Sequence, residues 1–168
     1  QASRWLGRGL IRIETFPAPG DVRYARAADC YDWTTILLRK EELARTLDAD
    51  WFIHHDADEI RESPWEGMGL AEAMRVVDRL DYNCIDFRIF EFPPINDAFC
   101  QGVDPRTHFT HYREAQQFDQ LQLKAWKASQ HPVALAQQAG HEAGFDGRRV
   151  FPIPFILRHY PIRSQAHG

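Results

Sequence analysis

Two aspartates that follow a short apolar segment are the residues best suited to chemistry. Asp56 and Asp58 come directly after residues 51–54, which read Trp-Phe-Ile-His. The apolar segment predicts a buried strand, and open α/β sheets bind ligands outside the carboxyl ends of their strands. Side chains two positions apart in an extended chain point the same way, and paired carboxylates attract Mg²⁺ or Mn²⁺. The alternative is an acidic turn that caps the next helix.

The elements that must position this motif are predicted from the periodicity of apolar residues. Alternating apolar residues and apolar runs predict strands over four further segments: residues 10–16, 84–92, 120–126 and 150–159. Apolar residues at helical spacing predict two helices, over residues 36–47 and 70–80. Pro152 and Pro154 are expected to place the last strand at an edge or to confine its pairing to its end. Strands that alternate with amphipathic helices indicate an α/β domain with a mixed sheet.

Two connecting segments have signals of their own. Ser63-Pro64-Trp65-Glu66 has the form of a capping box, which predicts a helix start, although Gly67 and Gly69 can break that turn. Residues 95–108 are expected to form a long loop, a length that is uncommon unless the loop has a function.

Composition bounds the class of protein. The chain has 168 residues, with 20 Lys and Arg against 24 Asp and Glu, so its formal net charge is −4. This size fits one domain, and the charge argues against a protein that binds mainly a nucleic-acid backbone. No run of about 20 apolar residues predicts a membrane span. Three widely spaced cysteines predict buried, reduced thiols in the cytosol, with membrane association through parts outside the chain left open.

The acidic motif also carries a resemblance to a known family. Residues 50–59 resemble the strand that leads into the Asp-x-Asp motif of glycosyltransferases with the GT-A fold, particularly family 2-like enzymes. Residues 157–164 (Leu-Arg-His-Tyr-Pro-Ile-Arg-Ser) are similar to the His-Tyr segment after the last core strand of those enzymes, and residues 124–126 and 140–142 look like their later strand and turn. The resemblance implies a GT-A mixed sheet flanked by helices, within one catalytic domain over residues 1–168. It also implies an N-terminally truncated fragment that lacks the first strand unit.

The resemblance implies a metal-dependent glycosyltransferase, which moves a sugar from a nucleotide-diphosphate donor to the hydroxyl of a saccharide or other acceptor. Asp58 would ligate Mn²⁺ or Mg²⁺, and Asp56 would share the metal or face the ribose of the donor. His159 is the candidate third metal ligand, with a structural histidine as the alternative. A divalent ion would stabilise the negative charge that grows on the leaving diphosphate.

Further residues are assigned to the donor. Arg158 and Arg163 have forked guanidinium donors that suit diphosphate oxygens, and His141 is expected to contact donor or acceptor.

An inverting mechanism needs a carboxylate that takes the proton of the acceptor hydroxyl. We assign this role to Asp97 and Glu142, while Glu91 and Asp119 are further candidates among which the sequence does not choose. Two other functions are left open. One is a phosphohydrolase similar to the haloacid dehalogenases, and the other is a sugar- or nucleotide-binding domain without catalysis.

Overall fold

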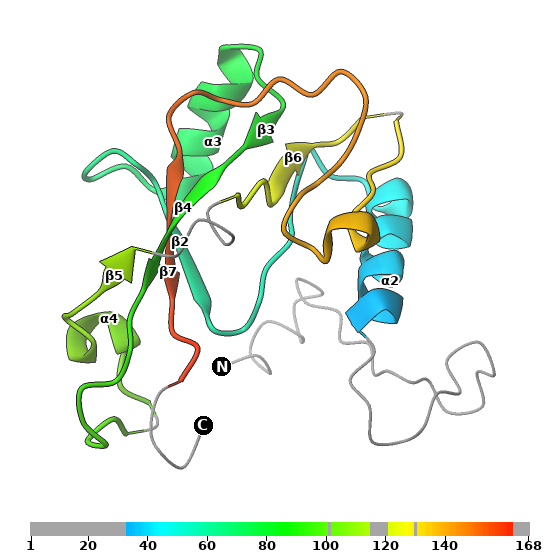
Figure 1. The fold of residues 1–168 in the computed structure, drawn as a ribbon. Coiled ribbons are helices and arrows are strands. Elements are labelled where there is room, and N and C mark those ends of the chain that lie inside the picture. Colours follow the sequence, from blue (N-terminus) through cyan, green and yellow to red (C-terminus); the bar gives the residue numbers. More distant parts are fainter. Residues whose placement is uncertain (1–32, 101, 115–120, 130, 163–168) are drawn as a thin grey trace.

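The part of the chain that the structure describes has mixed α/β structure with two sheets and flanking helices (Figure 1). The computed structural model describes four stretches: residues 33–100, 102–114, 121–129 and 131–162. The predicted strand over residues 10–16 lies outside them. The α/β class and the mixed sheet are confirmed within the described residues. None of the helices in these stretches has the length and apolar character that crossing a bilayer requires.

The first sheet is small and antiparallel. Its order is β1-β6-β3, with β1 at Trp51–Ile53, β6 at Ala125–Lys127 and β3 at Cys84–Ile85. The β1 strand follows from the predicted segment over residues 51–54, and β6 occupies only the end of the segment predicted over 120–126.

The second sheet is mixed. Its order is β2-β7-β4-β5, with β2 at Glu59–Glu62, β7 at Phe155–His159, β4 at Phe87–Glu91 and β5 at Arg113–Glu114. The central strand β7 runs antiparallel to β2 and parallel to β4. Apart from an isolated bridge between Val150 and Cys84, pairing of the predicted segment begins at Phe155, after Pro154. The strand itself is therefore confined to the end of the segment, as the prolines predict.

Helices form where apolar spacing predicts them. The α2 helix spans Trp33–Thr46 and α3 spans Leu70–Arg79, while short α4 (Pro105–His108) and the 3₁₀ helix η3 (Ala136–Gln138) lie in connecting segments. The helix start predicted at Ser63 is wrong. The Ser63 hydroxyl accepts a hydrogen bond from Trp65 N at 3.0 Å, but Gly67 has a φ of +72° and helix α3 begins only after Gly69.

Asp86 divides the strand that is predicted over residues 84–92. Its Oδ1 atom accepts hydrogen bonds from Phe87 N at 2.9 Å and from Gln122 N at 3.0 Å. Burial raises the pKa of this carboxyl, although both hydrogen bonds oppose the rise. Asp86 belongs to neither strand, and β3 before it pairs in the first sheet while β4 after it pairs in the second. One predicted strand is therefore two strands in two sheets.

Each face of the second sheet has its own apolar cluster. Helix α3 packs on one face, where Val77, Phe87, Phe155 and Leu157 are among the buried residues. The other face is covered by the segment after β4, which contributes to a cluster of Phe92, Phe109 and Tyr160. Alternation along β7 therefore puts Phe155, Leu157 and His159 on the α3 face and Arg158 on the opposite face.

The described cysteines differ in exposure. Cys84 is buried, and burial raises the pKa of its thiol to about 12, which agrees with a structural role. Cys100 is exposed, so the expectation of burial is wrong for that residue.

The Phe155 ring is the first stability test, because it is fully buried and contacts Phe87, Phe151 and Trp65. We expect Phe155→Ala to lower the free energy of unfolding by about 3–5 kcal/mol, through lost burial and a cavity. Denaturant unfolding measures the loss. Ile153→Ala is the control, since that side chain is 44% exposed and its removal should change stability by about 0.5 kcal/mol or less. Equal losses in the two variants would contradict this core.

Candidate functional site

The candidate site is built on a turn that joins β1 to β2. Glu59 N donates to Asp56 O at 3.2 Å, and Asp56 N donates to the Glu59 carboxylate at 3.3 Å. On the far side of the turn, Tyr160 N donates to Asp58 O at 2.8 Å and so extends the pairing of β2 with β7. The backbone of the acidic motif is thus fixed at both ends, and the side chains of Asp56 and Asp58 are about 40% exposed.

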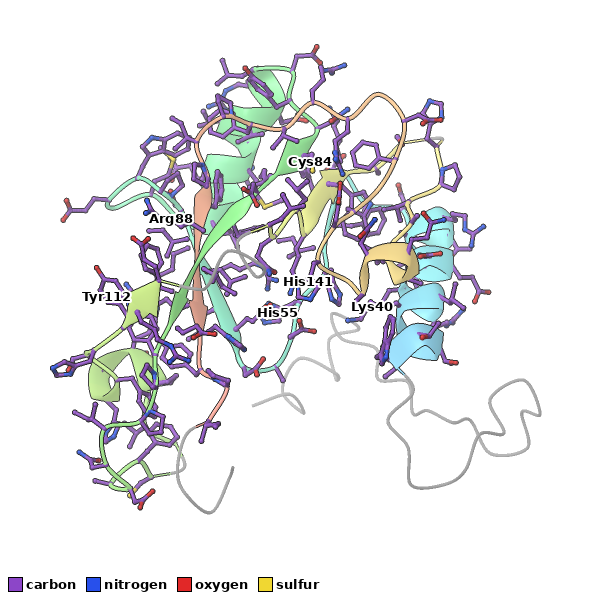
Figure 2. All side chains as sticks on the ribbon, viewed as in Figure 1. Lys40, His55, Cys84, Arg88, Tyr112 and His141 are labelled. Atoms are coloured by element: carbon purple, nitrogen blue, oxygen red, sulfur yellow. The ribbon has the colours of Figure 1, made fainter. Side chains whose placement is uncertain are left out.

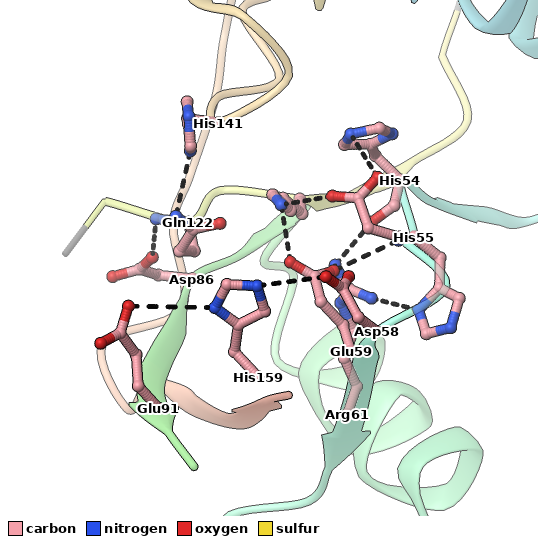
Figure 3. A network of polar contacts seen from close by, with 12 residues as sticks. His54, His55, Asp58, Glu59, Arg61, Asp86, Glu91, Gln122, His141 and His159 are labelled. Atoms are coloured by element: carbon pink, nitrogen blue, oxygen red, sulfur yellow. Dashed lines mark hydrogen bonds and ion pairs between the residues drawn. The ribbon is translucent and has the colours of Figure 1, made fainter. Parts of the chain in front are cut away.

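Glu59 is the buried centre of a network of charged side chains (Figure 3). Lys124 Nζ donates to one of its carboxylate oxygens at 2.9 Å, and Arg61 Nη2 donates to the other at 2.6 Å. Burial alone would raise the pKa of Glu59, but the charges of Lys124 and Arg61 outweigh it and hold the pKa below its ordinary value. Glu59 is therefore a buried carboxylate whose two oxygens are both bound by cations.

Arg61 connects this network to the residues that follow β1 and to the first residue of β4. Its guanidinium donates to His54 O at 2.7 Å and to His55 Nδ1, and it lies 5.1 Å from the centre of the Phe87 ring. Burial lowers the pKa of His55, and the positive charge of Arg61 lowers it further.

The network continues toward helix α2 through Lys124. The Lys124 ammonium also donates to Asp56 Oδ2 at 3.1 Å, and Asp56 Oδ1 lies 3.7 Å from His54 Nε2. On the other side of that ring, Lys40 Nζ donates to His54 Nδ1 at 2.9 Å. Figure 2 shows Lys40 on α2 and His55 on the segment that follows β1, so separate elements meet here. Burial tends to raise the pKa of Asp56, but Lys124 and His54 hold it below its ordinary value.

Gly140 lets a later loop close against this network. Its φ is +81°, and a Cβ at this position would lie 2.8 Å from His54 Nε2 and 3.1 Å from Leu37. The loop is fixed to α2 as well, because Glu41 accepts hydrogen bonds from Leu135 N at 2.6 Å and from Ala136 N at 2.9 Å. Glycine is required here by both its conformation and the close approach.

Asp58 and His159 meet beside this network. The Nε2 atom of His159 lies 3.4 Å from Asp58 Oδ2, although the residues are 101 positions apart. In Figure 3 the imidazole lies between Asp58 and Glu91, and Glu91 Oε1 is 4.0 Å from Nδ1. Among the described residues no group of three or more His, Cys, Asp or Glu has the spacing of a metal site. Two of the three predicted ligands, Asp58 and His159, thus lie together. The third, Asp56, instead accepts a hydrogen bond from Lys124.

The other predicted residues are spread around this pair. Arg158 lies on the opposite face of β7, where its Nε donates to Glu62 at 2.7 Å and its guanidinium covers Phe92. His141 Nδ1 lies 3.1 Å from Gln122 Nε2. Arg163 is outside the described residues, and the roles of all three in donor binding stay predictions.

The predicted carboxylate bases do not form a group. Glu142 is paired with Arg148, Asp97 is exposed on the segment after β4, and Asp119 is outside the described residues. Glu91, the fourth candidate, is the one that lies beside His159.

Lys40, Arg61 and Lys124 have no predicted role in the sequence analysis, although they set the charge of the site. A signal exists for two of them. Arg61 and Lys124 are charged residues flanked by apolar neighbours, Ile60 before the first and Leu123 and Ala125 around the second. A charge in such a position is buried only when it is paired, and the carboxylates nearby were the available partners.

Neither the models of known protein families nor the curated proteins include a match to this chain.

Substitution of Gly140 tests the closure of the loop on His54. We expect Gly140→Ala to destabilise the fold by about 2–4 kcal/mol, because it combines an unfavourable φ with a clash against His54. Thermal and denaturant unfolding provide the measurement. Gly147→Ala is the matched control: its φ is +72°, but no atom lies within 4 Å of the added Cβ. The control should lose only about 1–2 kcal/mol, and equal losses would contradict the close approach.

The pH dependence of stability tests the burial of His54. Burial, aided by Lys40, lowers the pKa of His54 from 6.5 to about 4. Between these values the unfolded chain binds a proton at His54 and the folded chain does not, so stability falls as the pH is lowered through this window. The loss is about 3 kcal/mol for this group. His54→Gln should flatten the dependence between pH 6.5 and 4, measured by urea unfolding at several pH values. An unchanged slope would mean that His54 is protonated in the fold.

Proposed function

We propose that the chain is a catalytic domain of a metal-dependent glycosyltransferase with the GT-A fold, which transfers a sugar from a nucleotide-diphosphate donor to an acceptor hydroxyl. The observation that carries the proposal is the meeting of Asp58 and His159 at 3.4 Å, at the C-terminal end of β7, where both side chains are partly exposed. The mixed sheet and the resemblance of residues 50–59 and 157–164 support it.

The donor atoms of this pair fit a divalent cation. Octahedral ions with bonds of about 2.1 Å hold neighbouring ligands about 3 Å apart, which is close to the spacing of Asp58 Oδ2 and His159 Nε2. Two protein ligands leave the remaining positions to water and to phosphate oxygens of the donor. A carboxylate with an imidazole suits Mn²⁺ better than Mg²⁺, which prefers oxygen ligands alone. The proposed cofactor is therefore Mn²⁺, with Mg²⁺ as the weaker alternative.

The charges around the pair also fit this chemistry. When bound, a divalent cation stabilises the negative charge on a departing diphosphate. Lys40, Arg61 and Lys124 add three positive charges beside Asp56 and Glu59, so this cluster has one cation in excess while both histidines are neutral. Lys40 is only partly buried and donates one hydrogen bond to His54, which leaves its ammonium two further N–H groups for an anionic sugar-donor substrate.

His141 is the residue predicted to contact donor or acceptor, and Asp97 and Glu142 are the predicted carboxylate bases. The proposal includes these roles as predictions, while the metal pair alone carries its test.

Ligand-dependent stability tests this function. We expect nucleoside diphosphates to raise the melting temperature only when Mn²⁺ is present, whereas phosphomonoesters should not raise it. At a ligand concentration one hundred times the dissociation constant, the gain in the free energy of unfolding is about 2.7 kcal/mol. Asp58→Asn and His159→Gln should each abolish the effect, because each removes a ligand of the cation. Release of nucleoside diphosphate from a panel of nucleotide-sugars measures turnover.

The control is Asp48→Asn, which removes an exposed carboxylate after α2 and should leave the stabilisation unchanged. Stabilisation that persists in Asp58→Asn would overturn the metal assignment. Equal stabilisation by phosphomonoesters would favour the phosphohydrolase instead.

A further inference from the structure

His159 lies in the middle of a polar row that crosses the second sheet. Its direct neighbours are Glu59 on β2 and Glu91 on β4, and Glu91 is in turn opposite Arg113 on β5. Residues opposite each other on neighbouring strands place their side chains close together on the same face. The row therefore brings two carboxylates and one arginine to the face on which the His159 imidazole lies.

The two nitrogens of His159 have different surroundings. The Nε2 atom faces Asp58 Oδ2 at 3.4 Å. The Nδ1 atom is buried and has no hydrogen-bond partner among the described residues, and a carboxylate oxygen, Glu91 Oε1, lies 4.0 Å from it. Because a buried polar atom without a partner is unfavourable, a small movement of Glu91 that closes this gap would be stabilising.

Glu91 is held in a position from which it can make this contact. Arg113 Nε donates to Glu91 Oε2 at 2.7 Å, which leaves Oε1 directed toward His159. The backbones are fixed too, since β4 and β7 are paired along their whole length and Phe92 N donates to His159 O at 2.8 Å. The Glu91 side chain is only 18% exposed, so water competes little for the carboxylate.

We infer that Glu91 is a positioning residue for His159: its Oε1 accepts the Nδ1–H hydrogen bond, which leaves the lone pair of Nε2 directed toward a divalent cation held together with Asp58. The inference deepens the proposed function and rests on its metal site. Histidines that bind metals usually donate their other N–H to a carboxylate or carbonyl, which fixes the tautomer and the ring orientation. This role differs from that of a general base, because Glu91 takes up no proton during the reaction.

Mn²⁺ affinity of the full chain, measured by electron paramagnetic resonance of the free ion, tests the inference without turnover. We expect Glu91→Ala to weaken Mn²⁺ binding by about 10-fold or more, since it removes the acceptor for Nδ1–H. Glu91→Gln should retain most of the affinity, because its amide oxygen still accepts that hydrogen bond. Glu114→Ala is the control, as it removes an exposed carboxylate of the neighbouring strand that pairs with Arg88. Glu91→Asp, which keeps the charge but shortens the reach, should also weaken binding and serves if Glu91→Ala does not fold.

The outcomes separate this inference from the proposed function. Wild-type affinity in both Glu91→Ala and Glu91→Asp would overturn the positioning role. Loss of turnover in Glu91→Gln, together with wild-type Mn²⁺ affinity in Glu91→Ala, would overturn it in favour of a general base. If the wild-type chain binds no Mn²⁺, both the inference and the metal site are wrong. If the variants behave as expected while no nucleoside diphosphate depends on Mn²⁺ for binding, the positioning role stands and the transferase proposal fails.

Discussion

The buried carboxylate of Glu59 is the constraint on which the site depends. A carboxylate with 4% of its side chain exposed is tolerated only when its charge is matched and its oxygens are hydrogen-bonded. Lys124, directly before β6, and Arg61, in β2, provide both conditions. Lys124 adjoins β6 of the first sheet, whereas Arg61 is in β2 of the second. The two ion pairs that stabilise the buried charge of Glu59 therefore also connect the two sheets.

The same constraint fixes which residues stay available for a ligand. Asp56 is drawn into the network by Lys124, and its backbone N–H is used by Glu59, so that Asp56 acts as part of the frame. Asp58 lies in the same turn, between Asp56 and Glu59, but its carboxylate faces His159 on β7. His54 and Gly140 extend the frame to α2 and to the loop after η3. A site with one fixed and one ligand-facing carboxylate is thus a consequence of burying Glu59 between two cations.

Local pattern was enough to predict the helices α2 and α3 and the strand β1, because each has an apolar stripe of the right period. It failed where a distant group decides the outcome. The alternation of Ile85, Phe87 and Ile89 runs straight through Asp86, and only the hydrogen bond from Gln122 N, 36 positions away, shows why the strand divides. The Ser63 hydroxyl does accept a backbone hydrogen bond, as its capping pattern predicts, but the segment forms a turn. Helix α3 begins only after Gly67 and Gly69.

For the site, the resemblance paired Asp58 with His159, and the structure brings these residues together. The cationic frame was not predicted, since the average charged residue is exposed and nothing in one sequence says which carboxylate a lysine will meet. Arg158 illustrates the reverse case: it neighbours His159 in the sequence, yet strand alternation turns it to the other face, toward Glu62.

Pulsed electron paramagnetic resonance of bound Mn²⁺ in protein with ¹⁵N-labelled histidine tests the central claim most directly. A histidine nitrogen that is coordinated to the ion has a much larger coupling than one that only lies nearby. The account predicts one directly coordinated histidine nitrogen in the wild-type chain, and the loss of this coupling when His159 is replaced, with the buried network intact. Bound Mn²⁺ without a nitrogen coupling, or a coupling that persists without His159, would contradict the pairing of Asp58 with His159 as the cation site.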